Sequence, residues 1–192
     1  MKIFQVQSVK KLKKAIRKIE SKAKVRMTVK KNNVTVRGNE LNEFVVGEIL
    51  RAIDFGFDPE DAMYLLNEDF VLEFVNIKNH TRRRNLEEVR SRVIGTDGRA
   101  KRTIEELTGA NIVINENMVG LIVNTEHLDS AVQGIISLIQ GSKHGNVFTY
   151  LEKQNATLRA ARSGDLGLKN PDLDLDNLDD EELEDVKDDF DL

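Results

Sequence analysis

Apolar residues recur along the chain with two alternating periods, one typical of strands and one typical of amphipathic helices. In the first 55 residues these periods predict strands at 2–6, 25–29 and 34–36, a helix at 8–21 and a second helix that follows Gly38-Asn39. Between residues 70 and 140 the same signals predict strands at 70–77, 111–115 and 119–124 and helices at 86–94, 98–108 and 126–140. The repeated order predicts an α+β protein of two related units, each with a three-stranded sheet packed by helices.

Two of these helices carry positional predictions. Ser8 is expected to cap the helix that follows it, because a serine side chain can accept a hydrogen bond from the first helical turn. In the helix after Gly38, the apolar positions three and four apart are expected to face the core. These positions are Leu41, Phe44, Val45, Ile49, Ala52 and Ile53.

Breaks in the pattern set the expected domain boundaries. Asp58-Pro59 is typical of a helix start and predicts a short connecting helix, whereas the glycines of residues 141–145 interrupt the last helix of the second unit. From residue 163 onward, acids alternate with isolated apolar residues, a composition that predicts disorder. The expected segments are a first unit, a linker helix, a second unit, an appended helix and an acidic tail, at 1–55, 56–69, 70–141, 142–162 and 163–192.

The net charge of −4 hides an uneven distribution of charge along the chain. Residues 1–37 carry 13 Lys and Arg against one acid, residues 81–102 carry eight against three, and residues 165–192 carry two against 13. This asymmetry predicts contact with nucleic acid and an acidic tail. The lysine-rich helix face at 10–18 has three open interpretations: it follows RNA, docks a partner protein or receives the chain's own tail.

Composition argues against several other classes of protein. Cysteine is absent, so disulfides and thiolate metal sites are excluded, and no apolar run approaches the ~20 residues needed to span a bilayer. The first residues lack the apolar stretch of a signal peptide, which favours a cytoplasmic protein. His80, His127 and His144 have neither metal-ligand spacing nor a nucleophile partner. We therefore expect no enzyme activity, no metal and no cofactor.

The most specific motif is Gly95-Thr96-Asp97-Gly98, which joins an apolar segment to a helix that opens with Arg99. Glycine permits a positive φ and close backbone approach, and a helix N-terminus carries partial positive charge, so the motif suits a phosphate. The alternative is an ordinary turn. The Asp97 carboxylate is an anomaly because it repels phosphate, whereas the Thr96 hydroxyl can donate a hydrogen bond to one.

Basic residues lie on both sides of this loop and extend the candidate RNA site. The three arginines that precede the helix at 86–94 could instead be a solvated helix start, and Ile94 could belong to the core rather than to an apolar platform under bases. The candidate RNA-binding residues are Arg82, Arg83, Arg84, Arg90, Arg92, Ile94, Gly95, Thr96, Asp97, Gly98, Arg99, Lys101 and Arg102.

The second unit resembles the KH domain, which binds RNA and single-stranded DNA through a G-x-x-G loop that clamps four backbone nucleotides. Its final helix after two strands resembles the type I order. The first unit resembles a degenerate copy of the same domain. No glycine lies between Val6 and Lys22, so a G-x-x-G loop is impossible there. The resemblance implies two tandem type I KH-like domains followed by the appended helix and the tail.

Segments 55–62, 92–110 and 143–152 resemble the Partner-of-Nob-One (Dim-two) family of archaeal and eukaryotic small-subunit assembly proteins. The resemblance implies a non-catalytic protein that binds single-stranded RNA, namely the 3′ region of small-subunit ribosomal RNA, during ribosome maturation. It further implies presentation of that RNA to the Nob endonuclease and, for archaeal members, a link to a translation initiation factor. The alternative is a KH-fold interaction scaffold in RNA-processing or initiation complexes.

Overall fold

The computed structural model describes residues 1–163, so the expected acidic tail lies outside the described residues from residue 164 onward. The first unit consists of β1 (Lys2–Gln5), α1 (Val9–Ala23), β2 (Arg26–Lys30), β3 (Asn33–Arg37) and α2 (Glu40–Phe55). Its strands form an antiparallel sheet in the order β1-β3-β2. The short helices α3 (Pro59–Ala62) and η1 (Met63–Leu66) lead into the second unit.

The second unit repeats this plan with additional helices between its first two strands. It consists of β4 (Phe70–Asn76), α4 (Ile77–His80), α5 (Leu86–Ile94), η2 (Thr96–Gly98), α6 (Arg99–Thr108), β5 (Asn111–Asn115), β6 (Met118–Asn124) and α7 (Thr125–Gln140). Its antiparallel sheet has the order β4-β6-β5, so the middle strand is again the last of the three along the chain. The predicted α+β fold of two sheets packed by helices is confirmed.

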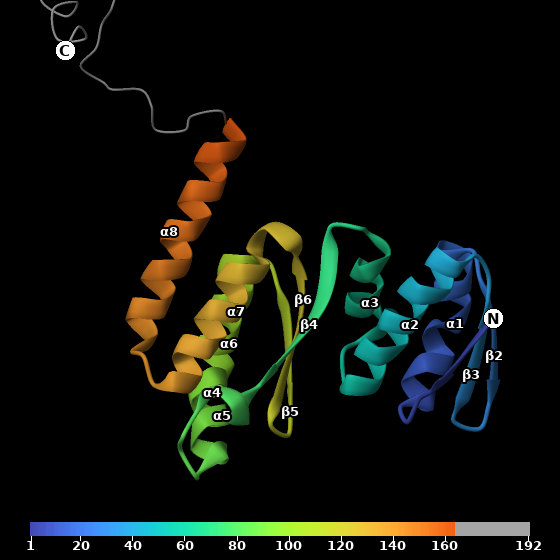
Figure 1. The fold of residues 1–192 in the computed structure, drawn as a ribbon, viewed down its shortest axis with the longest axis horizontal. Helices are drawn as coiled ribbons and strands as arrows, with labels where there is room; N and C mark the ends of the chain where they lie inside the picture. Colours follow the sequence, from blue (N-terminus) through green and yellow to red (C-terminus); the bar gives the residue numbers. More distant parts are fainter. Residues whose placement is uncertain (164–192) are drawn as a thin grey trace, which may run out of the picture. The chain divides into compact units, whose positions relative to one another are not determined.

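Both faces of the second sheet are covered (Figure 1). Successive side chains of a strand point to opposite faces, and all residues from Val119 to Val123 in β6 are buried. Leu121 packs in the core with α5, α6 and α7, whereas Ile122 packs in the core of the first unit. Gly120 lies so close to α2 that an added Cβ would be 2.7 Å from the Phe55 ring. The helices of the first unit therefore form a layer between the two sheets.

Two of the predicted core positions of α2 are wrong. Leu41 is 61% exposed and Phe44 is 57% exposed, whereas Val46 and Leu50 are buried along with the predicted Ile49. A single-face periodicity assumes that a helix contacts one layer, but α2 packs between two sheets. Its buried surface is consequently rotated away from the predicted stripe at the N-terminal end.

The start of α1 also differs from the prediction. Ser8 occupies the N-cap position, but its side chain makes no capping hydrogen bond. Instead, the Asp54 carboxylate of α2 accepts hydrogen bonds from the backbone N–H groups of Gln7 and Ser8, at 2.6 and 3.0 Å. The entry into α1 is thus fixed by a side chain 46 residues away rather than by a local cap.

The last helix, α8 (His144–Ser163), follows a turn at Gly141. Val147 and Leu151 of α8 are buried, and both lie about 3.5 Å from the position that a Cβ on Gly134 of α7 would occupy. Among residues 1–163, no helix combines the length and the apolar character needed to cross a bilayer.

Candidate nucleic-acid interface

The Gly95–Gly98 loop reverses the chain between α5 and α6 with three residues at positive φ. Gly95 has φ 74° and ψ 172°, Asp97 has φ 53° and Gly98 has φ 73°. The Gly98 N–H donates to the Gly95 carbonyl oxygen at 3.2 Å, which closes the turn. Glycine and aspartate are among the residues that best tolerate such angles.

The two glycines of the loop serve different purposes. A Cβ on Gly95 would lie 2.6 Å from the Cβ of Ala100 and 2.7 Å from its backbone nitrogen, so the loop backbone packs directly on the first turn of α6. A Cβ on Gly98 would meet only the Arg102 guanidinium, at 3.8 Å. Gly95 is therefore required by internal packing, whereas the space beside Gly98 is open to the backbone of a ligand.

The N-terminus of α6 is electrostatically suited to an anion. No side chain caps α6 at Gly98, and its first turn contains no acidic residue. At Asp97 the carbonyl oxygen, rather than the carboxylate, has a partner, because the Arg102 guanidinium donates a hydrogen bond to it. This bond closes the back of the loop. No side chain caps the partial positive charge at the N-terminus of α6, although the exposed Asp97 carboxylate lies directly before the cap residue.

Most of the predicted cations are engaged within the protein itself. Five of the eight make a hydrogen bond or an ion pair, as follows: Arg83 to Glu88 (2.7 Å), Arg90 to the Glu116 carbonyl (3.1 Å), Arg92 to the Ser142 carbonyl (2.8 Å), Lys101 to Glu105 (3.1 Å) and Arg102 to the Asp97 carbonyl. These contacts help to position α5 and α6. The five side chains are therefore less free to move toward a ligand than unpaired cations would be.

Three of the predicted cations remain available. Arg82, Arg84 and Arg99 are exposed and have no hydrogen-bond or ion-pair partner within residues 1–163. Arg82 lines a surface hollow of about 480 Å³ together with Arg83 and His80. Of the eight predicted cations, these three are the best candidates for direct contact with phosphate.

Arg92 has a structural role that the sequence does not reveal. Its guanidinium donates to the Ser142 carbonyl, and its own carbonyl oxygen accepts from the His144 Nε2 atom at 2.9 Å. Because a carbonyl oxygen can only accept, Nε2 is the donor in this hydrogen bond. Both contacts join the end of α5 to the turn before α8, about 50 residues along the chain, so no local pattern could have indicated them.

The apolar residues around the loop divide between the core and the surface. Val93 and Ile112 are 1% and 2% exposed and belong to the core of the second unit, whereas Ile94 is 38% exposed beside Gly95. Ile94 is thus the side chain most available to contact a base, and it stays a candidate on that ground. Ile114, half-buried in β5, packs against the edge of the core.

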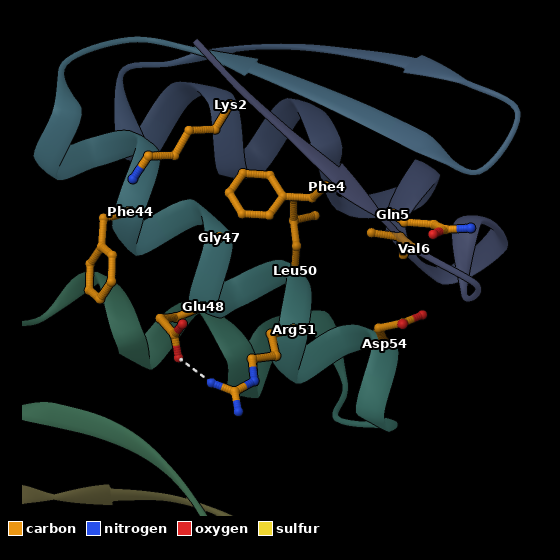
Figure 2. A pocket seen from close by; sticks show the side chains of 10 residues that line it. All are labelled: Lys2, Phe4, Gln5, Val6, Phe44, Gly47, Glu48, Leu50, Arg51 and Asp54. Carbon is orange, nitrogen blue, oxygen red and sulfur yellow. Dashed lines mark ion pairs between the residues drawn. The ribbon is translucent and has the colours of Figure 1, made fainter.

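The first unit contains a hollow of about 350 Å³ between β1 and α2 (Figure 2). Its polar lining includes the ion pair of Glu48 and Arg51 at 3.6 Å, and its apolar wall includes Phe4, whose ring lies against Gly47. No nucleophile with an adjacent base lines it. Within residues 1–163 no group of three or more His, Cys, Asp or Glu is placed to hold a metal ion.

One carboxylate of the first unit is buried and serves the fold. Glu43 is 3% exposed and accepts hydrogen bonds from the Met1 amino group at 2.9 Å and from the Gly38 N–H at 3.0 Å. The Met1 amino group, and then the Gly38 N–H, lower the pKa of Glu43 below its ordinary value of 4.5. Both partners stabilise the ionised form of this side chain.

Known proteins share this architecture. The family model for the second KH domain of PNO1, a eukaryotic-type (type I) KH domain, matches residues 71–156. The crystal structure of Dim2p from Pyrococcus horikoshii superposes with a TM-score of 0.71 at 30% identity, covering 79% of this chain and 98% of that one. The chain belongs to the Partner-of-Nob-One (Dim2) family.

One further member of the Partner-of-Nob-One family and a second Pyrococcus horikoshii structure extend the comparison. The pre-rRNA-processing protein PNO1 of Candida albicans is 32% identical over 136 residues, which cover 66% of this chain and 49% of that protein. The chain spans about half the length of the curated relatives it matches. A Pyrococcus horikoshii structure of an a/eIF2alpha–aDim2p–rRNA complex aligns with a TM-score of 0.69 at 29% identity, covering 81% of this chain and 93% of that one.

The matched KH domain contains the whole Gly95–Gly98 loop and all the candidate RNA-binding residues. Residues 1–70 lie outside the match, although they repeat the sheet order of the second unit. The first unit is therefore KH-like in topology but lacks the loop by which the domain family binds nucleic acid.

Proposed function

We propose that this protein binds single-stranded RNA through the Gly95–Gly98 loop and acts as a non-catalytic factor in the maturation of the small ribosomal subunit. The observation that carries this proposal is the geometry of the loop. Gly98 leaves open space at an uncapped helix N-terminus, and Arg99 stands exposed and unpaired beside it within the described chain. Such a site accepts a sugar–phosphate backbone that approaches closely.

The substrate that fits the family is the 3′ region of small-subunit ribosomal RNA. The Candida albicans relative is named for pre-rRNA processing, and the Pyrococcus horikoshii relative forms a complex with rRNA and a/eIF2alpha. These names support a role in rRNA maturation and contact with a translation initiation factor. On the sequence resemblance alone, we further propose that the protein acts in the cytoplasm and holds the RNA end for the Nob endonuclease. In this role the KH domain positions the RNA, and the partner performs the cleavage.

The test is a comparison of two aspartate variants in the full chain. Gly98→Asp places a carboxylate at the open side of the loop, whereas Gly109→Asp places one at the opposite end of the same helix, also at a left-handed glycine with no atom within 4 Å of its Cβ position. Both variants carry the same charge and comparable backbone strain. Binding to a single-stranded RNA with the small-subunit 3′-end sequence is measured by fluorescence anisotropy.

We expect Gly98→Asp to weaken binding at least about tenfold, because a carboxylate replaces open space at the phosphate position. Gly109→Asp should leave the affinity within about twofold of the parent, since it changes the charge by the same amount far from the loop. Equal affinities of the two variants would show that the loop does not contact RNA, and the proposed mechanism would then be wrong.

A second candidate function, an interaction scaffold, is favoured by an apolar hollow between α2 of the first unit and β4 of the second. The hollow measures about 400 Å³ and is lined by Leu41 and Phe44 of α2 and by Phe70 and Leu72 of β4. Exposed apolar side chains grouped in this way are typical of protein contacts. If this function dominates, a partner that co-purifies with the Gly98→Asp variant after RNase treatment should be lost when Phe44→Ser is added.

A further inference from the structure

The solvent face of α1 carries a dense row of positive charge that the Gly95–Gly98 loop does not explain. Leu12 and Ile19 of α1 are fully buried, so the helix is fixed with its opposite side toward solvent. The exposed cations on that side are Lys11, Lys13, Lys14, Arg17, Lys18 and Lys22. This helix belongs to the unit that lacks a G-x-x-G loop and lies outside the matched KH domain.

The cations at one edge of this row serve the fold. Lys18 forms an ion pair with Glu60 at 2.7 Å, and Lys11 lies 3.9 Å from Asp58, so both connect α1 to α3 and the residue before it. Lys13, Lys14 and Arg17, which we term the lysine face, have no hydrogen-bond or ion-pair partner among the described residues. Positions 13 and 17 are four residues apart, which is ~6 Å along the helix axis. This rise is comparable with the spacing of neighbouring phosphates on an RNA strand.

Helix stability does not account for the charges of α1. Its first turn contains no acidic residue, and a cation near a helix N-terminus opposes the helix dipole at a cost of about 0.3 to 1 kcal/mol. Lys24, which ends α1, and Lys31, in the β2–β3 turn, have positive φ values of 53° and 54°, where glycine or asparagine is less strained. The same unit therefore places lysine repeatedly where another residue would stabilise it more.

The chemistry of the lysine face distinguishes RNA from a protein partner. Protein interfaces depend on apolar and aromatic anchors at their centre. The exposed large apolar residues of the described chain are Met1, Ile3, Leu41, Phe44, Tyr64 and Ile94, and none of them lies on α1. A row of unpaired cations without an apolar anchor is complementary to a phosphate backbone, which carries negative charge at regular intervals and presents no apolar group to fill a pocket.

We propose that the lysine face binds the phosphate backbone of RNA independently of sequence, as a second RNA contact beside the Gly95–Gly98 loop. This inference rests on the proposed function, because it concerns the same RNA-binding protein. The loop would define which single-stranded segment is held, and the lysine face would add affinity from flanking RNA of any sequence, including duplex. The contact would depend steeply on salt, since each neutralised phosphate releases counterions.

The test uses the full chain with Lys13→Gln, Lys14→Gln and Arg17→Gln combined. The matched control combines Lys13→Arg, Lys14→Arg and Arg17→Lys, which changes the same three positions but keeps every charge. Circular dichroism checks that both variants keep their helix content. Binding to a blunt RNA duplex of mixed sequence and to the single-stranded 3′-end RNA is then measured over a series of KCl concentrations.

For the duplex, we expect neutralisation to reduce the slope of log affinity against log salt by about 2 to 3 and to weaken binding at least about tenfold. The charge-preserving control should bind as the parent does. Gly98→Asp should retain the affinity for duplex RNA while its affinity for the single-stranded RNA falls. The single strand therefore tests the proposed function, and the duplex tests this inference separately.

Two results would overturn the inference. If the neutralised variant has the parent's salt slope on duplex RNA, the lysine face does not contact RNA. If neutralisation instead raises the affinity for RNA, the face is occupied by an acidic segment, such as the chain's own C-terminal residues, and RNA is not its ligand.

Discussion

Substitution of Gly95 by alanine should destabilise the protein much more than the same change at Gly98, three residues away. At Gly95, the φ of 74° with a ψ of 172° lies in a region that only glycine visits readily, and residues forced into it cost about 1 to 3 kcal/mol. The added Cβ would also lie 2.6 Å from the Ala100 Cβ, an overlap that requires backbone movement and costs about 1 to 3 kcal/mol. The two costs sum to about 2 to 6 kcal/mol, and we expect a value near the middle of this range, about 3 to 4 kcal/mol.

At Gly98, only the backbone strain applies. Its φ of 73° and ψ of 14° lie in the left-handed helical region, where alanine costs about 1 to 2 kcal/mol, and no atom lies within 3.8 Å of the new Cβ. Gly98→Ala should therefore lower the free energy of unfolding by about 1 kcal/mol, roughly 2 kcal/mol less than Gly95→Ala. With a urea dependence of about 1 to 3 kcal/mol per molar, this difference separates the two midpoints by about 1 M.

The assay is urea unfolding followed by circular dichroism at the helix minimum, with parent and both variants measured in parallel. The chain contains no tryptophan, so the backbone signal reports unfolding without an added probe. Coincident midpoints for Gly95→Ala and Gly98→Ala would refute the reasoning, because they would show that the close approach of Gly95 to α6 does not contribute to stability.

Three further outcomes follow from other contacts. The Met1 amino group holds the pKa of Glu43 below 4.5, so the ionised side chain stabilises the fold above pH 4.5 and loses this effect as the pH falls through the lowered pKa. In urea unfolding at a series of acidic pH values, the free energy of unfolding of Glu43→Gln should therefore fall less with pH than that of the parent. Parallel curves would contradict this. In urea unfolding, Arg92→Ala should lower the free energy of unfolding by about 1 to 3 kcal/mol, whereas Arg82→Ala should change it by less than about 0.5 kcal/mol. In fluorescence anisotropy, Arg82→Ala should instead weaken RNA binding. Gly120→Ala should lower the thermal midpoint by several degrees, because its Cβ would lie 2.7 Å from the ring of Phe55; an unchanged midpoint would mean that the second sheet does not pack closely on α2.

The sequence pattern predicted the second unit more accurately than the first. The strand at 111–115 and the helix at 86–94 have the predicted bounds, because each is a clear periodic run limited by glycine or by a capping residue such as Asn85. The side-chain directions of α2 were not predictable, because they depend on packing against a second sheet whose strands lie farther along the chain, between residues 70 and 124. Periodicity reports that a helix has an apolar face, but it does not report that two layers share that helix.

The same limit explains why the position of the Gly95–Gly98 loop could be predicted while the roles of its neighbouring cations could not. A G-x-x-G turn is a local property of the backbone, so its glycines and the uncapped start of α6 follow from the sequence alone. The partner of an arginine is a non-local property: Arg92 and Arg90 look alike in the sequence, yet they reach carbonyls 50 and 26 residues away. An arginine held to a carbonyl must break that bond or share it to bind phosphate, so its contribution to RNA affinity is smaller than that of an unpaired one. Local charge density therefore does not reveal how many cations are unpaired: five beside the loop have partners within the protein, and on α1 two lysines pair with Glu60 and Asp58.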